Sequence, residues 1–119
     1  MGLKRMVRGL NVSLDDLEHQ RLSSRFEDLE VDRVSLGECR LRCRIRVAGE
    51  ITSLRVVTRG GCPSLEVTID DGTGSALAVF TGRRDIRGID PGRGLVLEGV
   101  VRRERGRLTM VNPSYTLLP

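Results

Sequence analysis

The feature that most restricts what this chain can fold into is a strictly alternating run near its centre. Residues 39–51 read CRLRCRIRVAGEI, with apolar residues on one face (Leu41, Cys43, Ile45 and Val47) and a row of arginines on the other (Arg40, Arg42, Arg44 and Arg46). A period of two is typical of a β-strand that buries one face. The pattern continues to about residue 58. A strand of that length usually bends, so we expect a bulge or a coil at Gly49.

Four shorter strand patterns follow this long one. They cover residues 65–70, 75–80, 93–103 and 107–118, and residues 81–92 form a connection with at most one short helical turn. Pro113 has no N–H to donate, so we expect Asn112 and Pro113 at a bulge or an edge of the last strand. Five strands in this order, the first long and curved, favour a small five-stranded Greek-key barrel of the OB type; an SH3-like barrel is the competing architecture.

Between the second and third strands lies the sequence DDGTG, residues 70–74, which places two carboxylates beside two glycines. Asp71 and Gly72 both tolerate positive φ and are typical of a hairpin turn, in which aspartate side chains accept backbone N–H bonds. A metal site would need more ligands, and the chain has one histidine, His19, outside the strands. We therefore interpret DDGTG as a turn.

The N-terminal part of the chain has a different pattern. We expect residues 1–12 to form a flexible arm and residues 13–30 an amphipathic helix, with Ser13 as the N-cap and two aspartates in the first turn. The apolar residues at helical spacing are Leu14, Leu17, Leu22, Phe26 and Leu29. The barrel domain is expected to span residues 38–119.

Charge and composition narrow the function. Aromatic residues are only 3% of the chain, so the core must be aliphatic, and nineteen of the twenty basic residues are arginines. Residues 1–40 have a net charge of −1, whereas residues 41–119 have +5, so an anionic partner would bind the second part. Arginine has a planar guanidinium that suits phosphate and stacks on bases.

Three cysteines, Cys39, Cys43 and Cys62, make an odd count without the spacing of a zinc site. The start of the chain lacks the apolar segment of a secretory leader, and no apolar run approaches the length of a membrane span. We therefore expect reduced thiols, a cytoplasmic location, no contact with a membrane, and no metal or other cofactor.

Residues 45–118 resemble OB-fold nucleic-acid-binding domains. The successive elements DGTG, AVF, PG and NPSY are most similar to the wedge OB domain of RecG-type branch-migration helicases and to short stand-alone OB-fold proteins of GC-rich bacteria. The resemblance implies a mainly all-β chain, an OB-fold barrel with one N-terminal α-helix. It does not bring the helicase motor, because the chain has no Walker-type loop. No nucleophile–histidine pair indicates a hydrolase either, so we expect no enzymatic activity.

In this fold the loops after the first and fourth strands flank the binding face, which directs attention to the arginines there. The candidate nucleic-acid-binding residues are Arg55, Arg59, Phe80, Arg83, Arg84, Arg87, Arg102, Arg103, Arg105, Arg107 and Tyr115. The alternative is that these arginines are solvated and partly paired with Glu104 and Asp85. Phe80 either points outward and stacks on a base or fills the barrel, and a lone phenylalanine in so aliphatic a chain favours the core.

The alternating row from Arg40 to Arg46 has two open interpretations: a phosphate track, or cross-strand ion pairs with Glu66 or Glu98. The predicted function is non-catalytic nucleic-acid binding through an arginine-lined groove, with single-stranded or branched DNA as ligand and RNA as the alternative. The resemblance also implies a protein partner in DNA repair or recombination. The alternative function is a protein–protein interaction module that uses the barrel or the N-terminal helix, which the scarcity of aromatic residues fits.

Overall fold

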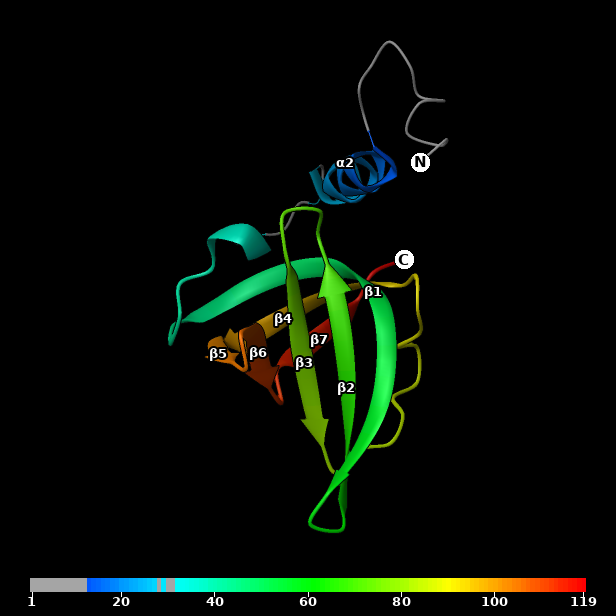
Figure 1. Ribbon diagram of the computed structural model, residues 1–119, viewed down its shortest axis with the longest axis vertical. Helices are drawn as coiled ribbons and strands as arrows, with labels where there is room; N and C mark the ends of the chain where they lie inside the picture. Colours follow the sequence, from blue (N-terminus) through cyan, green and yellow to red (C-terminus); the bar gives the residue numbers. More distant parts are fainter. Residues whose placement is uncertain (1–12, 28, 30–31) are drawn as a thin grey trace.

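The protein, seen in a computed structural model, has one helix above a strongly curled sheet (Figure 1). The structure describes residues 13–27, 29 and 32–119, except for the side chain of Arg59. The predicted arm at residues 1–12 lies outside the described residues, as do residues 28, 30 and 31. The elements are α2 (Leu14–Glu27), a 3₁₀ turn η1 (Leu36–Glu38), β1 (Arg44–Arg59), β2 (Cys62–Asp70), β3 (Ser75–Thr81), β4 (Gly94–Val100), β5 (Arg102–Glu104), β6 (Arg107–Val111) and β7 (Ser114–Leu117).

Helix α2 begins where the capping signal predicts. The Oγ of Ser13 accepts a hydrogen bond from the N–H of Asp16 at 3.1 Å, and the Asp16 carboxylate accepts one from the N–H of Ser13 at 3.3 Å. These reciprocal bonds satisfy two of the donors that a helix N-terminus leaves open. The described helix ends at Glu27, three residues before the predicted end.

Strand β1 is the longest element and joins two parts of the sheet. Residues 44–50 pair with β4, and residues 50–59 pair with β2. No bulge lies at Gly49, because the register of β1 shifts between Ile51 and Ser53. Gly49 instead allows close strand contact, because a Cβ there would lie 3.1 Å from the Cβ of Ile69.

The alternating run enters the sheet later than its pattern predicts. Strand β1 starts at Arg44, and Arg42 has a left-handed backbone, with φ of 63°. The N–H of Arg42 donates to the carbonyl of Val101 at 2.7 Å. Left-handed backbone interrupts the alternation, so Arg40 and Arg42 do not belong to the row on the strand, which consists of Arg44 and Arg46.

The five predicted strands are present, although two of them are interrupted. The fourth is split at Val101 into β4 and β5, and the fifth is split at Asn112 and Pro113 into β6 and β7. Asn112 has a φ of 50°. The register between the fourth and fifth predicted strands shifts by one residue across this break, from Arg102↔Thr109 in β5–β6 to Glu98↔Ser114 in β4–β7. The expectation for Asn112 and Pro113 is therefore confirmed: they lie at the break.

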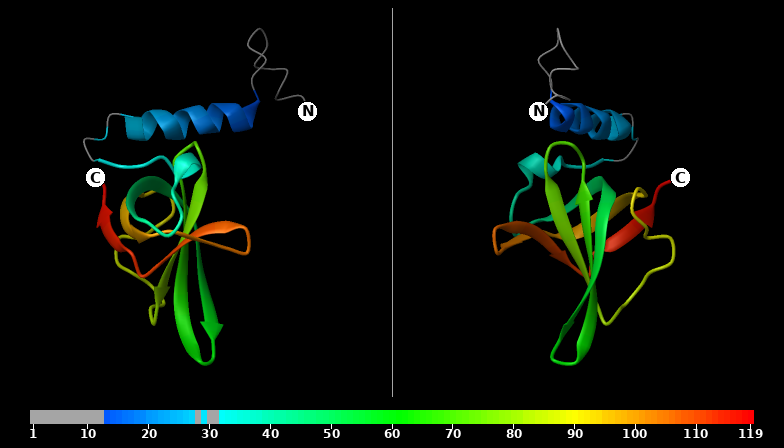
Figure 2. Two further views of the ribbon diagram at one scale, coloured as in Figure 1. Left: turned by 90° about the vertical axis from the view of Figure 1, so that its left-hand side faces the viewer. Right: turned by 45° about the vertical axis from the view of Figure 1, so that its right-hand side comes forward.

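The sheet has the order β5-β6-β3-β2-β1-β4-β7, with β3 and β6 parallel and all other pairs antiparallel. Because β4 continues into β5 and β6 continues into β7, the chain itself connects the two ends of the sheet, which curls around its core (Figure 2). This is the predicted mainly-β OB-type architecture with one N-terminal helix.

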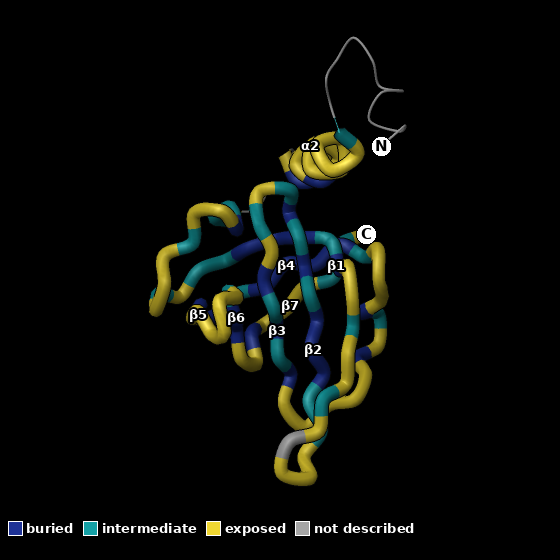
Figure 3. Tube along the Cα trace, in the orientation of Figure 1, coloured by how far each residue is buried: buried dark blue, intermediate teal, exposed yellow. Residues whose placement is uncertain are grey.

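The core is aliphatic, as the composition predicts, with Phe80 as its one aromatic side chain. Ile86 and Ile89, from the connection between β3 and β4, are buried in it, and no helix forms in that connection. Helix α2 lies over the turn between β2 and β3, and its exposed surface faces away from the barrel (Figure 3). Phe26 of α2 packs on Ala48 and Val96, on the outside of the β1–β4 pair.

Candidate nucleic-acid interface

The turn between β2 and β3 has a structural role. The carboxylate of Asp71, only 3% exposed, accepts hydrogen bonds from the N–H and hydroxyl of Thr73 at 2.8 and 2.6 Å, and from the N–H of Gly74 at 3.2 Å. Its second oxygen accepts a bond from the N–H of Leu36 at 2.9 Å. Asp70 accepts a bond from the N–H of Gly72 at 2.7 Å. The interpretation of DDGTG as a turn is confirmed.

Helix α2 is fixed above this turn by ion pairs with one carboxylate. Glu50, whose side chain is 14% exposed, receives hydrogen bonds from Arg21 at 2.9 and 3.1 Å and a short one from Arg25. The hydrogen bonds from Arg21, and then the one from Arg25, lower the pKa of Glu50 against the opposing effect of burial. Arg25 also donates to the carbonyl of Gly92 at 3.0 Å, so α2 is connected to β1 and to the end of the β3–β4 connection.

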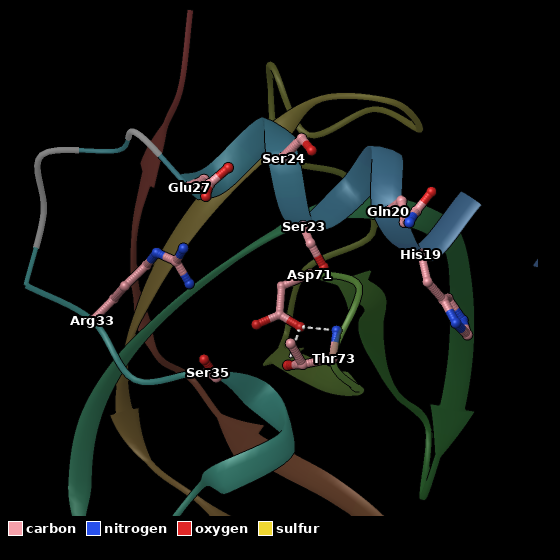
Figure 4. A pocket seen from close by; sticks show the side chains of 9 residues that line it. All are labelled: His19, Gln20, Ser23, Ser24, Glu27, Arg33, Ser35, Asp71 and Thr73. Atoms are coloured by element: carbon pink, nitrogen blue, oxygen red, sulfur yellow. Dashed lines mark hydrogen bonds between the residues drawn. The ribbon is translucent and has the colours of Figure 1, made fainter. Parts of the chain in front are cut away.

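A cavity of about 680 Å³ lies between α2 and the turn (Figure 4). It is polar and of mixed charge, lined by His19, Gln20, Ser23, Ser24, Glu27, Arg33, Ser35, Asp71 and Thr73. The Asp71 carboxylate faces it with its hydrogen bonds already made to the turn and to η1. Two acidic side chains in the lining oppose the binding of a polyanion, so this cavity is a poor candidate for a nucleic-acid site.

A second concavity lies on the outer face of the sheet, across β2, β3 and β6. Outward positions of these strands form its floor because side chains alternate along a strand. It encloses about 430 Å³ and is lined by Arg55, Cys62, Ser64, Glu66, Leu77, Val79, Thr81, Glu104, Arg105, Arg107, Thr109 and Val111. We call these residues the outer groove.

Three arginines surround an aliphatic floor in the outer groove. Arg55 of β1 pairs with Glu66 at 3.3 Å, and Arg107 of β6 donates to the hydroxyl of Thr68 at 3.1 Å. Arg105 lies in the two-residue turn between β5 and β6 and, in the described part of the chain, makes no hydrogen bond or ion pair. Its φ of 52° is uncommon for a residue other than glycine. A guanidinium is thus presented to solvent from a strained backbone position.

The structure brings only part of the predicted arginine set together. Arg55, Arg105 and Arg107 line the outer groove, whereas Arg84 and Arg87 line a separate depression beside β1, which Arg55 also borders. Arg102 lies 4.0 Å from Glu104, as the alternative interpretation expects, and Arg103 donates to the carbonyl of Gly106. Arg83 is exposed on the β3–β4 connection. Arg59 ends β1, and its side chain lies outside the description.

The two aromatic candidates lie at the barrel interior and beside it. Phe80 is 5% exposed and belongs to the core, the placement that the aliphatic composition favours. Its ring meets that of Tyr115 edge-on, with centroids 5.7 Å apart. Tyr115 is partly exposed on β7, and neither ring lines the outer groove. Phe80 has no open ring face on which a base could stack.

The arginine row on β1 forms cross-strand pairs. Glu98 of β4 accepts hydrogen bonds from Arg46 at 3.1 Å and from Arg44 at 3.3 Å, and these bonds, from Arg46 first, lower the pKa of Glu98. Of the two interpretations of the row, the pairing with Glu98 is the one observed. These arginines lie outside the outer groove.

The floor of the outer groove is not predictable from local sequence patterns. Leu77, Val79 and Val111 are apolar residues on the outward face of strands whose other face fills the core. Alternation predicts which residues share a face, but the parallel pairing of β3 with β6 brings these three together, and no local signal encodes it. Glu66, 7% exposed, also lines the outer groove, whereas the sequence pattern predicts it only as a partner for the β1 row.

Two further observations concern the described residues. None of their helices is long and apolar enough to cross a membrane. Within residues 13–27, 29 and 32–119, no group of three or more histidine, cysteine, aspartate or glutamate side chains has the arrangement of a metal site.

The family described as OB-fold nucleic acid binding domain matches residues 45–118, more than half of the chain. No curated protein sequence matches.

Several solved structures share the fold at low sequence identity. The replication factor A related protein from Methanobacterium thermoautotrophicum aligns with a TM-score of 0.55 and 19% identity over 76% of this chain and 94% of that one. The second OB-fold domain of replication protein A from Methanococcus maripaludis aligns with a TM-score of 0.55 and 12% identity over 71% of this chain and 93% of that one. RecG bound to a three-way DNA junction aligns with a TM-score of 0.53 and 15% identity over 61% of this chain but only 11% of RecG.

Proposed function

The chain belongs to the family of OB-fold nucleic-acid-binding domains, and on that premise we propose that its outer groove binds single-stranded or branched DNA without catalysis. The observation that carries the proposal is the joint placement of Arg55, Arg105 and Arg107 around the aliphatic floor of the outer groove. Guanidinium groups bind phosphates, and a floor of Leu77, Val79 and Val111 offers apolar contact to bases.

The chemistry of the outer groove predicts weak base recognition and strong salt dependence. Stacking on aromatic side chains supplies much of the affinity in many single-strand-binding proteins, and the outer groove has none. Phosphate contacts must then supply most of the binding energy. If each of the three arginines neutralises one phosphate of a single strand, log K falls with log salt with a slope of about −2.

The acidic groups in the outer groove lower the affinity for a polyanion. Glu66 and Glu104 oppose the three arginines, so the local excess of positive charge is small. Arg55 is already paired with Glu66, and this pair must open or be shared when a phosphate binds. We therefore expect modest affinity at moderate salt and a gain in affinity when Glu66 is neutralised.

Structures of similar fold support the choice of DNA as the ligand. RecG is bound to a three-way DNA junction in the structure that this chain resembles, and other relatives of this fold are replication protein A domains. A branched ligand would place a single strand in the outer groove beside a duplex. We propose a cytoplasmic location, where Cys39, Cys43 and Cys62 stay reduced, and a protein partner in DNA repair or recombination.

Fluorescence anisotropy tests the proposal. Labelled oligo-dT, oligo-U, a forked DNA and a blunt duplex are titrated with the protein over a series of salt concentrations. We expect the single strand and the fork to bind more tightly than the duplex. We also expect the double variant R105A/R107A to lower the salt slope by about 1.4, since each phosphate contact contributes about 0.7.

Arg44→Ala and Arg46→Ala are the matched controls, because each removes an arginine that pairs with Glu98 away from the outer groove. These variants should leave the affinity for oligo-dT almost unchanged. Equal losses in the control and groove variants would show that binding follows net charge and not the outer groove. No binding of any ligand at low salt would refute the proposal.

A chemical footprint locates the ligand. Cys62 is exposed and lines the outer groove, whereas Cys39 and Cys43 are partly buried. Bound oligo-dT should slow the alkylation of Cys62 and leave the rates of the other two thiols unchanged. An unchanged rate at Cys62 under saturating DNA would place the nucleic acid elsewhere.

A further inference from the structure

The C-terminal half of β1, residues 53–59, has one edge without a strand beside it. Residues 44–50 of β1 pair with β4, but residues 53–59 pair only with β2. The bonds between β1 and the end of the β3–β4 connection stop at Ile51, which donates to Arg93 and accepts from Gly92. Beyond Ile51 the outer edge of β1 has no backbone partner in the described part of the chain.

The register identifies the backbone groups that this edge presents. Gly60 and Gly61, with φ of 58° and 78°, form a two-residue turn, so the flanking pair Arg59↔Cys62 exchanges hydrogen bonds across the hairpin. Because the direction of the N–H groups alternates along a strand, the N–H and C=O groups of Leu54, Val56 and Thr58 point to the open edge. Unpaired strand edges of this kind are templates for another strand.

A depression of about 290 Å³ runs along this edge, between β1 and the β3–β4 connection, which lies beside β1 in Figure 1. Its apolar wall consists of Leu54, Val56, Leu65, Ile86 and Ile89. Val56 is 44% exposed although it lies on the face of β1 that turns toward the core. An incoming strand could therefore bury aliphatic side chains here while its backbone bonds to β1.

The charge around the depression selects the occupant. Arg84 and Arg87 line it and, among the described residues, form no ion pair or side-chain hydrogen bond. Arg55 lies at its border and Arg83 is adjacent in sequence. These four arginines outnumber Asp85 and Asp90, so a second copy of this surface would be repelled, whereas an acidic segment would be attracted.

We propose that the open edge of β1 binds an extended segment of a partner protein, with aliphatic residues at alternate positions and acidic residues beside them. The segment adds a strand next to Leu54–Thr58, places its aliphatic side chains against Val56 and Leu54, and pairs its carboxylates with Arg84 and Arg87. Main-chain bonds would supply affinity, and the depression would supply specificity. This surface differs from the outer groove, with which it shares only Arg55.

Nuclear magnetic resonance with a defined probe tests the proposal. The probe is the blocked peptide Asp-Thr-Val-Thr-Val-Thr-Asp, and the control is the same peptide with lysine in place of both aspartates. We expect the acidic peptide to shift the amide signals of Leu54, Val56 and Thr58 and to slow their hydrogen exchange. The lysine peptide should bind at least about threefold more weakly, in keeping with the strength of exposed ion pairs.

Two matched pairs make the result specific to strand addition. One peptide is N-methylated on both valines and the other on two threonines. Because N–H groups alternate between the two edges of a strand, one of these two peptides loses donors that face β1, and the other loses donors that face solvent. The peptide that keeps its donors toward β1 should keep its affinity. The affinity of the other peptide should fall roughly fivefold or more, because a backbone hydrogen bond to β1 is removed. The variant R84E/R87E, which changes only exposed side chains, should reverse the preference between acidic and lysine peptides.

Several outcomes would overturn the proposal. Equal effects of the two N-methylated peptides would exclude backbone pairing, and the absence of shifts at millimolar acidic peptide would exclude the site. Concentration-dependent protection of the same amides in the free protein would assign the edge to a second copy. Displacement of the acidic peptide by oligo-dT, with shifts at the same amides, would assign it to nucleic acid.

Discussion

The carboxylate of Asp71, in the turn between β2 and β3, accepts a hydrogen bond from the backbone N–H of Leu36, 35 residues earlier in the chain, at 2.9 Å. The hydroxyl of Thr73 reinforces this link by accepting a bond from the N–H of Gly37 at 3.0 Å. A local turn motif therefore also anchors η1, whose Leu36 is part of the core. The same turn carries α2 on its outer side.

Removing the charge of Asp71 should destabilise the protein. In Asp71→Asn the amide cannot accept the full set of bonds from Leu36, Thr73 and Gly74, and the site is buried. We expect the free energy of unfolding in urea to fall by about 2–4 kcal/mol. Asp70→Asn is the control, because Asp70 is half-buried and accepts one local bond, and it should cost about 1 kcal/mol. Equal losses would mean that the link to η1 adds nothing.

Gly72→Ala should displace α2. A Cβ at Gly72 would lie 2.5 Å from the carbonyl of His19 and 2.7 Å from the N–H nitrogen of Ser23, so the helix must move. Gly92→Ala has the same φ of +90° with no atom within 4 Å of the added Cβ. Both variants should lose about 1–2 kcal/mol from backbone strain, but only Gly72→Ala should accelerate hydrogen exchange at Leu22 and Phe26. Similar exchange in the two variants would contradict this packing.

The attachment of α2 should weaken in acid. Arg21 and Arg25 lower the pKa of Glu50 below its ordinary value of 4.5, so its contribution to stability is complete above that pH and is lost as the pH falls through the lowered pKa. We expect the amide signals of α2 to change below about pH 4.5. Glu50→Gln should remove that transition and loosen α2 at neutral pH. An unchanged transition in Glu50→Gln would assign it to other carboxylates.

Arg105 should show a conflict between stability and binding. Its left-handed backbone costs about 1 kcal/mol relative to a residue that tolerates this conformation. Arg105→Asn should therefore raise the free energy of unfolding in urea by up to about 1 kcal/mol. The same variant should weaken oligo-dT binding and lower its salt slope by about 0.7. A variant that gains stability without losing affinity would show that Arg105 takes no part in binding.

Local sequence patterns predicted most of the secondary structure. Alternation identified the strands, Asp71 and Gly72 identified the turn, and Ser13 with Asp16 identified the start of the helix. The errors fall where backbone conformation departs from the pattern. Left-handed Arg42 delays the start of β1, and the register shift of β1 lies between Ile51 and Ser53 and not at Gly49.

The candidate site was predicted less completely, because the arginines on all the loops that flank the binding face were expected to lie in one groove. Arg55, Arg105 and Arg107 do meet, whereas Arg84 and Arg87 lie beside the other edge of β1. The connection that carries them folds Ile86 and Ile89 into the core, which directs it away from the outer groove. Burial of Ile86 and Ile89 thus decided where the neighbouring Arg84 and Arg87 lie.

The sequence by itself determined which segments form strands, the turn between β2 and β3 and an aliphatic core, because each depends on neighbours a few residues apart. Only the tertiary structure decided which strands lie side by side. The parallel pairing of β3 with β6 builds the floor of the outer groove, and the division of β1 between β4 and β2 leaves one edge open. Such pairings join residues far apart in the chain, and they are set by closure of the whole sheet around its core.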